Sequence, residues 1–204
     1  MSYYGYGRRG LDATWYLIII NSIVFFFTYI MEILNPFFYN YQVLPLLALV
    51  PDLVIIHPWT IFTHMFVHAG IWHVLSNMLT LYFFGEFLSN IVGQRKFLWV
   101  YFLGGLAGAL FYIIFAFTLL PGMRNAAAVG ASGAVFAVGG ALVALRPNTR
   151  VFMFPLPIPI PLWVAILVGF LFIQPGIAWQ AHLGGLVAGL FMGYLFRKQE
   201  RRYY

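Results

Sequence analysis

The stretch VGASGA, residues 129–134, opens a run of small and apolar residues that ends at Arg146. The run from Ser132 to Leu145 contains no charge and no proline and predicts a helix. It is shorter than the about 20 residues that a helix needs to cross a bilayer. Its first turn must therefore lie inside the protein, where it faces packed side chains or a water-filled cavity. Ser132, flanked by Gly130 and Gly133, thus starts a helix at a depth where polar side chains are costly.

The composition identifies a membrane protein with several spans. Of 204 residues, 63% are hydrophobic and 8% are charged, and a soluble domain of this size cannot bury so much apolar surface. The formal net charge of +6 comes from basic residues beside apolar segments. Basic residues in such positions reflect the orientation of a protein in the membrane more often than binding of a nucleic acid. The chain has no cysteine, so disulfides, thiol nucleophiles and thiolate metal sites are excluded.

Six apolar segments predict an all-α polytopic membrane protein, a bundle of six transmembrane helices with a short fourth helix that starts inside the membrane. The segments run over residues 13–33, 73–93, 97–120, 132–145, 161–173 and 178–196. We therefore expect a membrane domain at residues 13–196 between a short tail at 1–12 and a basic tail at 197–204. Because the first segment is long and no small-residue cleavage pattern follows it, we expect it to be retained rather than removed as a signal peptide.

Two stretches between the segments are rich in proline. The connection 35–72 contains four prolines, which break helices, and it predicts an interfacial loop that packs into or beside the bundle. Residues 155–161, PLPIPIP, alternate proline with aliphatic side chains. They predict an extended segment, with Pro161 as the first residue of the fifth helix.

The basic residues indicate the orientation of the chain, because short cytoplasmic loops collect lysine and arginine. With six spans, all but one of the 11 Lys and Arg side chains fall on the side of the N-terminus, and only Arg124 falls on the other. Both termini are therefore expected to be cytoplasmic.

Two polar side chains of the fourth and sixth segments lie at one depth. Ser132 is separated from the interfacial Arg146 by about 21 Å of helix, and His182 from Arg197 by about 22 Å. Both therefore lie roughly 10 Å below the outer surface of a hydrocarbon core about 30 Å thick. His182 could accept the Ser132 proton and return it to a leaving amine, which makes the pair a candidate dyad with no carboxylate to orient the imidazole.

Further groups near this depth suit acyl transfer. The unpaired N–H groups at the start of the fourth helix can stabilise an oxyanion. His73 and Asn77 share one face of the second helix, and the Asn77 amide can donate to the same oxyanion. Four glycines allow a substrate or a neighbouring helix to approach the backbone closely: Gly130, Gly133, Gly185 and Gly189.

Three motifs, in this order, resemble the rhomboid family of intramembrane serine proteases. They are His73-x-x-x-Asn77 on the second segment, GASG at residues 130–133, and AHxxGxxxG at residues 181–189. The six-helix arrangement also matches, so the resemblance covers nearly the whole chain. The sequence departs from the family pattern at Ser89, where the family often has a glutamate.

The resemblance implies a role for each of these residues. Ser132 would be the nucleophile and His182 the general base of a dyad that hydrolyses peptide bonds in or near transmembrane segments. His73, Asn77 and the Ser132 N–H would form the oxyanion site. Phe136, one turn after the serine, would pack on the His182 ring.

The resemblance also implies how a substrate reaches the site. The connection 35–72 would be the family's first loop, lying partly in the outer leaflet. The fifth helix and residues 174–180 would form the gate and cap through which the transmembrane helix of another membrane protein enters from the lipid bilayer. The site would open to the extracytoplasmic side and would need no cofactor.

Other functions fit the sequence less well. A catalytically silent rhomboid-like protein that binds membrane clients is the main alternative, but it should have lost the serine or the histidine. A proton-coupled transporter would be expected to show an inverted repeat, which is not evident. Metal binding is disfavoured because no carboxylate or cysteine joins the histidines at ligand spacing. His64 is predicted to be structural, the role of His68 is open, and nothing indicates an oligomeric state.

Overall fold

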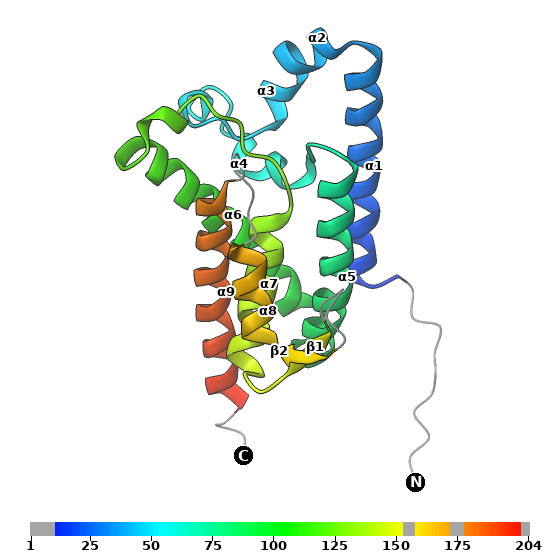
Figure 1. The fold of residues 1–204 in the computed structure, drawn as a ribbon, viewed down its shortest axis with the longest axis vertical. Helices are drawn as coiled ribbons and strands as arrows, with labels where there is room; N and C mark the ends of the chain where they lie inside the picture. The colour runs from blue at the N-terminus through cyan, green and yellow to red at the C-terminus, as the bar shows by residue number, and fades with distance from the viewer. Residues whose placement is uncertain (1–10, 153–157, 172–177, 201–204) are drawn as a thin grey trace.

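A computed structural model describes residues 11–152, 158–171 and 178–200. The predicted tails, the proline-rich stretch 155–161 and the predicted cap 174–180 therefore lie partly outside the described residues. Within these residues the secondary structure is mostly helical, as predicted, and α1, α5, α7 and α9 run roughly along the long axis of the molecule (Figure 1).

Helix α1 (Ala13–Leu34) packs along α5 (Ile71–Val92) (Figure 1). Asp12 caps α1, because its carboxylate accepts a hydrogen bond from the Trp15 N–H at 3.1 Å. The two helices approach closely where Gly85 faces Thr14, since a Cβ at Gly85 would lie 2.9 Å from the Thr14 methyl carbon. Helix α5 starts two residues before the predicted boundary, at Ile71, so His73 lies in its first turn.

Gly93 alone separates α5 from α6 (Gln94–Thr118). Its φ of +83° lies in the left-handed region, which glycine adopts without strain. The Gly93 N–H donates to the Ser89 carbonyl at 2.8 Å and closes α5. The chain therefore turns from one long helix into the next within a single residue.

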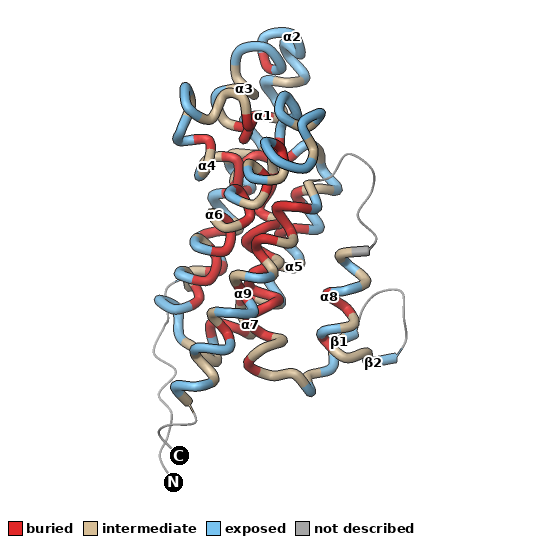
Figure 2. The backbone as a smooth tube through the Cα atoms, turned by 90° about the vertical axis from the view of Figure 1, so that its left-hand side faces the viewer, coloured by how far each residue is buried: buried red, intermediate tan, exposed pale blue. Residues whose placement is uncertain are grey.

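The core lies where α6, α7 (Ser132–Leu145) and α9 (Trp179–Glu200) pack against one another. Figure 2 shows the buried residues concentrated in these helices and in α5. Helix α7 occupies its predicted residues and is surrounded on most sides. Small residues permit this packing: a Cβ at Gly104 would collide with the Ala137 side chain, and one at Gly140 would lie 2.7 Å from the Leu186 carbonyl oxygen.

The connection between α1 and α5 folds into short helices. These are α2 (Pro36–Phe38), a π-helical turn (Tyr39–Val43), α3 (Leu44–Leu47), a 3-10 turn (Pro51–Leu53), α4 (Thr60–Thr63) and a second 3-10 turn (His64–Phe66). His57, Trp59 and Thr63 each donate a side-chain hydrogen bond to one of the carbonyls of residues 45–47, at 3.1, 2.8 and 2.8 Å. These bonds satisfy the carbonyls at the end of α3 and hold the connection as a packed unit.

Two short antiparallel strands lie at the opposite end of the molecule, β1 (Arg150–Phe152) and β2 (Pro159–Pro161) (Figure 1). Strand β2 agrees with the extended conformation predicted for this stretch. The prediction that Pro161 starts the fifth helix is wrong, because Pro161 ends β2 and α8 (Leu162–Leu171) begins one residue later. The Leu162 N–H continues the strand pairing by donating to the Thr149 carbonyl at 2.9 Å.

Large apolar side chains cover much of the outer surface. Ile55 is 90% exposed, Trp72 81% and Leu34 78%, which is more than an isolated soluble domain normally leaves in water. Among the described residues, α1 and α6 are long and apolar enough to cross a membrane, and α7 is apolar but shorter. Two of the six predicted spans thus meet this criterion.

Candidate active site

The backbone turns sharply just before α7, at Gly130. Its φ of +118° is in the range that favours glycine. A Cβ at this position would also lie 2.7 Å from His73 Nε2, so the turn and the close approach of the imidazole both require glycine. The Gly130 N–H donates to the His64 carbonyl at 2.9 Å, which fixes the turn against the preceding connection.

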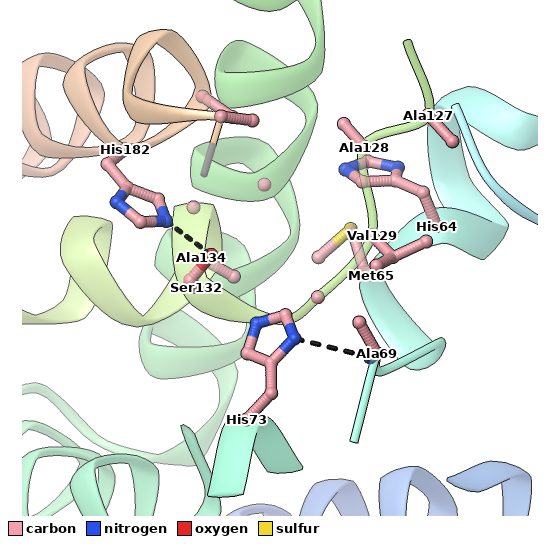
Figure 3. A pocket seen from close by; sticks show the side chains of 15 residues that line it. His64, Met65, Ala69, His73, Ala127, Ala128, Val129, Ser132, Ala134 and His182 are labelled. Atoms are coloured by element: carbon pink, nitrogen blue, oxygen red, sulfur yellow. Dashed lines mark hydrogen bonds between the residues drawn. The ribbon is translucent and has the colours of Figure 1, made fainter. Parts of the chain in front are cut away.

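Ser132 is the first residue of α7, and His182 lies in the first turn of α9. His182 Nε2 and Ser132 Oγ are 2.6 Å apart (Figure 3). With the imidazole proton on Nδ1, the hydroxyl donates to Nε2, so the ring is placed to take the serine proton. His182 Nδ1 is buried and has no hydrogen-bond partner within the described residues. The imidazole is therefore oriented there by packing rather than by a carboxylate.

Packing on the His182 ring comes from Phe136, one turn after the serine. The two ring centroids are 4.6 Å apart and the planes differ by 23°. Phe170 of α8 meets the same Phe136 ring edge-on, at 5.9 Å. Phe136 thus lies between the imidazole and α8, where it limits rotation of the imidazole.

Glycines bring the two helices close enough for the serine and histidine to meet. A Cβ at Gly185 would collide with the Gly133 carbonyl, and one at Gly189 with the Ala137 carbonyl. Helices α7 and α9 could not approach so closely if a larger residue stood at Gly185 or Gly189. The contact between Ser132 and His182 therefore depends on the glycine repeat of α9.

The Ser132 hydroxyl and the His182 ring border a cavity of about 170 Å³. Among the described residues it is lined by His64, Met65, Ala69, His73, Gly105, residues 127–130, residues 132–134, Ala178, Ala181 and His182. Figure 3 shows side chains from α5, α7, α9 and the connection before α5 converging on it. No three His, Asp or Glu side chains within the described ranges could share a metal ion there or elsewhere.

His73 and Asn77 differ in how they relate to this cavity. The Ala69 N–H donates to His73 Nδ1 at 3.3 Å, so a neutral His73 carries its proton on Nε2, the nitrogen that faces Gly130 (Figure 3). Asn77 is 6% exposed and donates its side-chain amide to the His73 carbonyl at 2.8 Å. His73 lines the cavity, whereas Asn77 is not among the described lining residues.

Two further histidines support the loop that precedes Ser132. His64 Nδ1 donates to the Thr60 carbonyl at 3.0 Å, and burial lowers the pKa of His64 to about 4. His68 Nε2 accepts from the Ala131 N–H at 3.4 Å, and burial, followed by the nearby His73, lowers the pKa of His68 to about 3. Both rings are therefore neutral at ordinary pH. The sequence predicted a structural role for His64, but the contact of His68 with Ala131 joins distant segments and could not be predicted.

The segment 126–130, just before α7, runs extended along the cavity. Ala128 exchanges two backbone hydrogen bonds with Leu49, at 3.0 and 2.8 Å. The backbone groups of Ala127 and Val129 have no partner within the part of the chain that the structure describes, and both residues line the cavity. One edge of this segment is thus paired with Leu49, and the other has no partner among the residues that the structure describes. The sequence of this segment gave no sign of it.

The chain is similar in sequence to a family model and to several known proteins. A family model described as Rhomboid domain matches residues 57–199. The chain is 33% identical over 144 residues to Rhomboid protein 1, mitochondrial, of Saccharomyces cerevisiae, a match that covers 65% of this chain and 40% of that protein. It is 33% identical over 135 residues to Rhomboid protease GluP of Bacillus subtilis, covering 65% of this chain and 25% of that protein.

A further relative of the chain is named as an inactive protein. The chain is 30% identical over 132 residues to Inactive RHOMBOID-like protein 8 of Arabidopsis thaliana, a match that covers 64% of this chain and 36% of that protein. In each of these three matches the chain spans less than half the length of its relative. The family match itself extends from the connection before α4 to the end of α9 and includes both Ser132 and His182. The chain therefore belongs to the rhomboid family and is an integral membrane protein.

Proposed function

We propose that the chain is an intramembrane serine endopeptidase that hydrolyses peptide bonds in or near the transmembrane segments of other membrane proteins. The observation that carries this proposal is the 2.6 Å contact between Ser132 Oγ and His182 Nε2 at the edge of a cavity. Rhomboid proteins are generally proteases of this kind, and one relative of this chain is named a protease. The catalytic residues would be Ser132 and His182.

The proposal includes six transmembrane helices: α1, α5, α6, α7, α8 and α9. Helices α1, α5, α6 and α9 have 22, 22, 25 and 22 residues, and at about 1.5 Å per residue each is longer than the about 30 Å of the hydrocarbon core. Helix α7 has 14 residues, or about 21 Å, and starts below the outer surface. Residues 13–196 form the membrane domain, both termini are cytoplasmic, and the cavity opens to the extracytoplasmic side.

The reaction begins when Ser132 Oγ attacks the scissile carbonyl carbon and its proton passes to His182 Nε2. The tetrahedral intermediate collapses as the C–N bond breaks, and His182 returns the proton to the leaving amine. Water then attacks the acyl-enzyme ester with His182 again as the base, which releases the carboxylic acid and restores the Ser132 hydroxyl. No group besides this pair and water is needed to balance the protons.

Charge on the oxyanion is stabilised by donors at the start of α7 and on α5. The Ser132 N–H lies in the first turn of α7 and has no intrahelical acceptor, and the positive end of the helix dipole adds to its effect. The Nε2–H of His73 is the side-chain donor that faces the cavity. The Asn77 side-chain amide donates a hydrogen bond to the backbone carbonyl of His73. We therefore assign Asn77 to the oxyanion site together with His73.

The substrate binds in an extended conformation beside residues 126–130. The N–H and C=O groups of Ala127 and Val129, which bond no group within the described ranges, suit the addition of one more strand. A transmembrane helix must unwind to present such a strand, so small or helix-breaking residues are expected near the cleaved bond. Entry past α8 and residues 174–180 is part of the proposal, although 174–177 lie outside the described residues.

A client-binding protein without catalysis is the alternative, and one relative of the chain is named inactive. It is disfavoured because this chain retains both Ser132 and His182 in hydrogen-bond contact. A protein that only binds clients has no need of this contact, since any small residue would fill the position of Ser132.

Labelling with a fluorophosphonate tests the proposal. The purified full chain in detergent should form an adduct at Ser132, located by mass spectrometry, and should cleave transmembrane peptides. Ser132→Ala should abolish labelling and His182→Ala should reduce it at least about a hundredfold. Ser89→Ala, which removes a buried hydroxyl elsewhere on α5, should label normally. A folded wild-type chain that neither labels nor cleaves any peptide would favour the client-binding alternative.

A further inference from the structure

A second hollow lies at the far end of α7 and α9 from the candidate dyad. It is a cleft of about 320 Å³, lined within the described residues by Leu145, Arg146, Pro147, Asn148, Thr149 and Arg197. Helix α7 separates it from Ser132 by about 21 Å, so it is not part of the active-site cavity. Figure 1 shows the C-terminal ends of α7 and α9 at the same end of the molecule as β1 and β2.

Several side chains that donate hydrogen bonds line this cleft. Arg146 binds Glu200 through two nitrogens, at 3.0 and 3.3 Å, and donates to the Leu145 carbonyl at 3.1 Å. Arg197 donates one nitrogen to the Ala144 carbonyl at 3.3 Å. Its other N–H groups, the Asn148 amide and the Thr149 hydroxyl bond no group in the described part of the chain. The cleft therefore offers donors without matching acceptors, which suits an oxygen-rich ligand.

The charges around the cleft favour an anion. Arg146 and Arg197 line it, and Arg150 and Lys198 are their near neighbours in the sequence. The carboxylate described at this end is Glu200, which neutralises Arg146 alone. The Arg197 guanidinium pairs with no carboxylate among the described residues, so it can hold a phosphate group through charge-assisted hydrogen bonds, with the Arg146 guanidinium held beside it by Glu200.

The position of the cleft identifies the kind of anion. The apolar part of α7 ends at Leu145 and that of α9 at Phe196, so the cleft lies where lipid headgroups begin if these helices cross the bilayer. Basic pockets between transmembrane helices on the cytoplasmic side are typical sites for anionic headgroups. We propose that the cleft of Arg146, Asn148, Thr149 and Arg197 binds the phosphate of an anionic phospholipid. The inference rests on the membrane placement in the proposed function but not on catalysis.

Native mass spectrometry of the full chain tests this binding. The detergent-solubilised protein is incubated with phosphatidylglycerol, with zwitterionic phosphatidylcholine, or with inorganic phosphate. The wild-type chain should retain phosphatidylglycerol in preference to the other two. Arg197→Gln should weaken retention about tenfold, since it removes charge-assisted hydrogen bonds. Lys198→Gln removes the same charge from an exposed neighbour that does not line the cleft, and should weaken it less than about threefold.

A second variant separates lipid binding from folding. Arg197 also bonds the end of α7, so its loss could disturb the helix contact. The double variant Asn148→Ala, Thr149→Val leaves both helices and both arginines in place and should still reduce retention several-fold. Equal losses for Arg197→Gln and Lys198→Gln would show a diffuse basic surface and overturn the site. Retention of inorganic phosphate in place of the lipid would overturn the assignment to a headgroup.

Labelling and lipid retention measured on the same samples distinguish a failure of the proposed lipid site from a failure of the proposed protease activity. Normal labelling of Ser132 together with no lipid preference would overturn the headgroup site and leave the protease intact. A clear lipid preference in a chain that does not label at Ser132 would support the headgroup site while contradicting catalysis.

Discussion

Arg124 Nε donates a hydrogen bond to Asp52 Oδ1 at 2.8 Å, and the Asp52 N–H donates back to the Arg124 carbonyl at 3.0 Å. The Arg124 guanidinium also lies 4.8 Å from the ring centre of Phe117, near the end of α6. Arg124 thus joins the connection between α1 and α5 to the loop between α6 and α7. That loop continues into residues 126–130, the segment on which we expect the substrate strand to align.

Arg124→Gln should therefore impair substrate binding more than chemistry. The ion pair is 47% and 27% exposed, so its loss should lower the free energy of unfolding by no more than about 1 kcal/mol. The segment 126–130 would be less well ordered, and KM for a transmembrane peptide should rise about three- to tenfold with kcat nearly unchanged. Fluorophosphonate labelling of Ser132, which does not use this segment, should stay normal. The exchange Asp52→Arg, Arg124→Asp should restore part of the loss, whereas equal falls in labelling and cleavage would contradict a positioning role.

Gly185→Ala should separate α7 from α9. The new Cβ collides with the Gly133 carbonyl, so the helices must move apart and the Ser132–His182 contact must lengthen. We expect loss of labelling and a fall of about 1–3 kcal/mol in the free energy of unfolding, as for other overpacked sites. Gly169→Ala on α8 is the matched control, because a Cβ there meets no atom of the described residues within 4 Å. Normal labelling of a folded Gly185→Ala chain would show that the contact does not depend on this glycine.

Phe136→Leu should reduce kcat about tenfold with little change in KM. The imidazole of His182 has no side-chain partner at Nδ1 among the described residues, so stacking on Phe136 limits its rotation. A less well oriented base takes the serine proton less often. Phe170→Leu removes the ring on the other side of Phe136 and should have a smaller effect. Steady-state cleavage of one peptide by the three chains measures both constants, and an equal loss in the two variants would assign the effect to general packing.

His73→Ala should lower kcat/KM more than Asn77→Ala does. His73 faces the cavity with an Nε2–H that bonds no acceptor in the described part of the chain, and removal of one oxyanion donor costs roughly a hundredfold or more in rate. Asn77 already donates to the His73 carbonyl, so its loss acts partly through the position of His73. Cleavage rates of both variants, with circular dichroism to confirm folding, decide the order. A larger loss in Asn77→Ala would place its amide, rather than His73, at the oxyanion.

Acid should destabilise the fold through His64. Burial lowers the pKa of His64 from 6.5 to about 4, so between these pH values the unfolded chain binds a proton that the folded chain does not. Stability is therefore complete above about pH 6.5 and falls towards pH 4, by up to about 3 kcal/mol. His64→Asn cannot titrate, and its unfolding temperature should depend less on pH over this window. An unchanged pH dependence in the variant would show that other groups dominate.

The sequence by itself determined where the long helices of the chain lie. The predicted bounds of α7 agree with the structure because the apolar run ends at Arg146 and Pro147, a charge and a helix breaker that no neighbour can override. The prolines of the connection 35–72 predict breaks in helical structure, yet Pro36 and Pro51 stand at the starts of short helical turns, where proline is well tolerated. Local patterns of this kind report the conformation of the backbone.

Only the tertiary structure decided which residues of different helices and loops are in contact. Equal depth left the distance between Ser132 and His182 open, and the packing of Gly185 on Gly133 sets it. Depth also suggests Asn77 as a donor, whereas in the structure its amide bonds the His73 carbonyl one turn earlier in the same helix. The pair of Asp52 and Arg124 lies 72 positions apart in the chain. Such contacts depend on helix rotation and loop packing, which no local pattern encodes because they arise from the fit of distant surfaces.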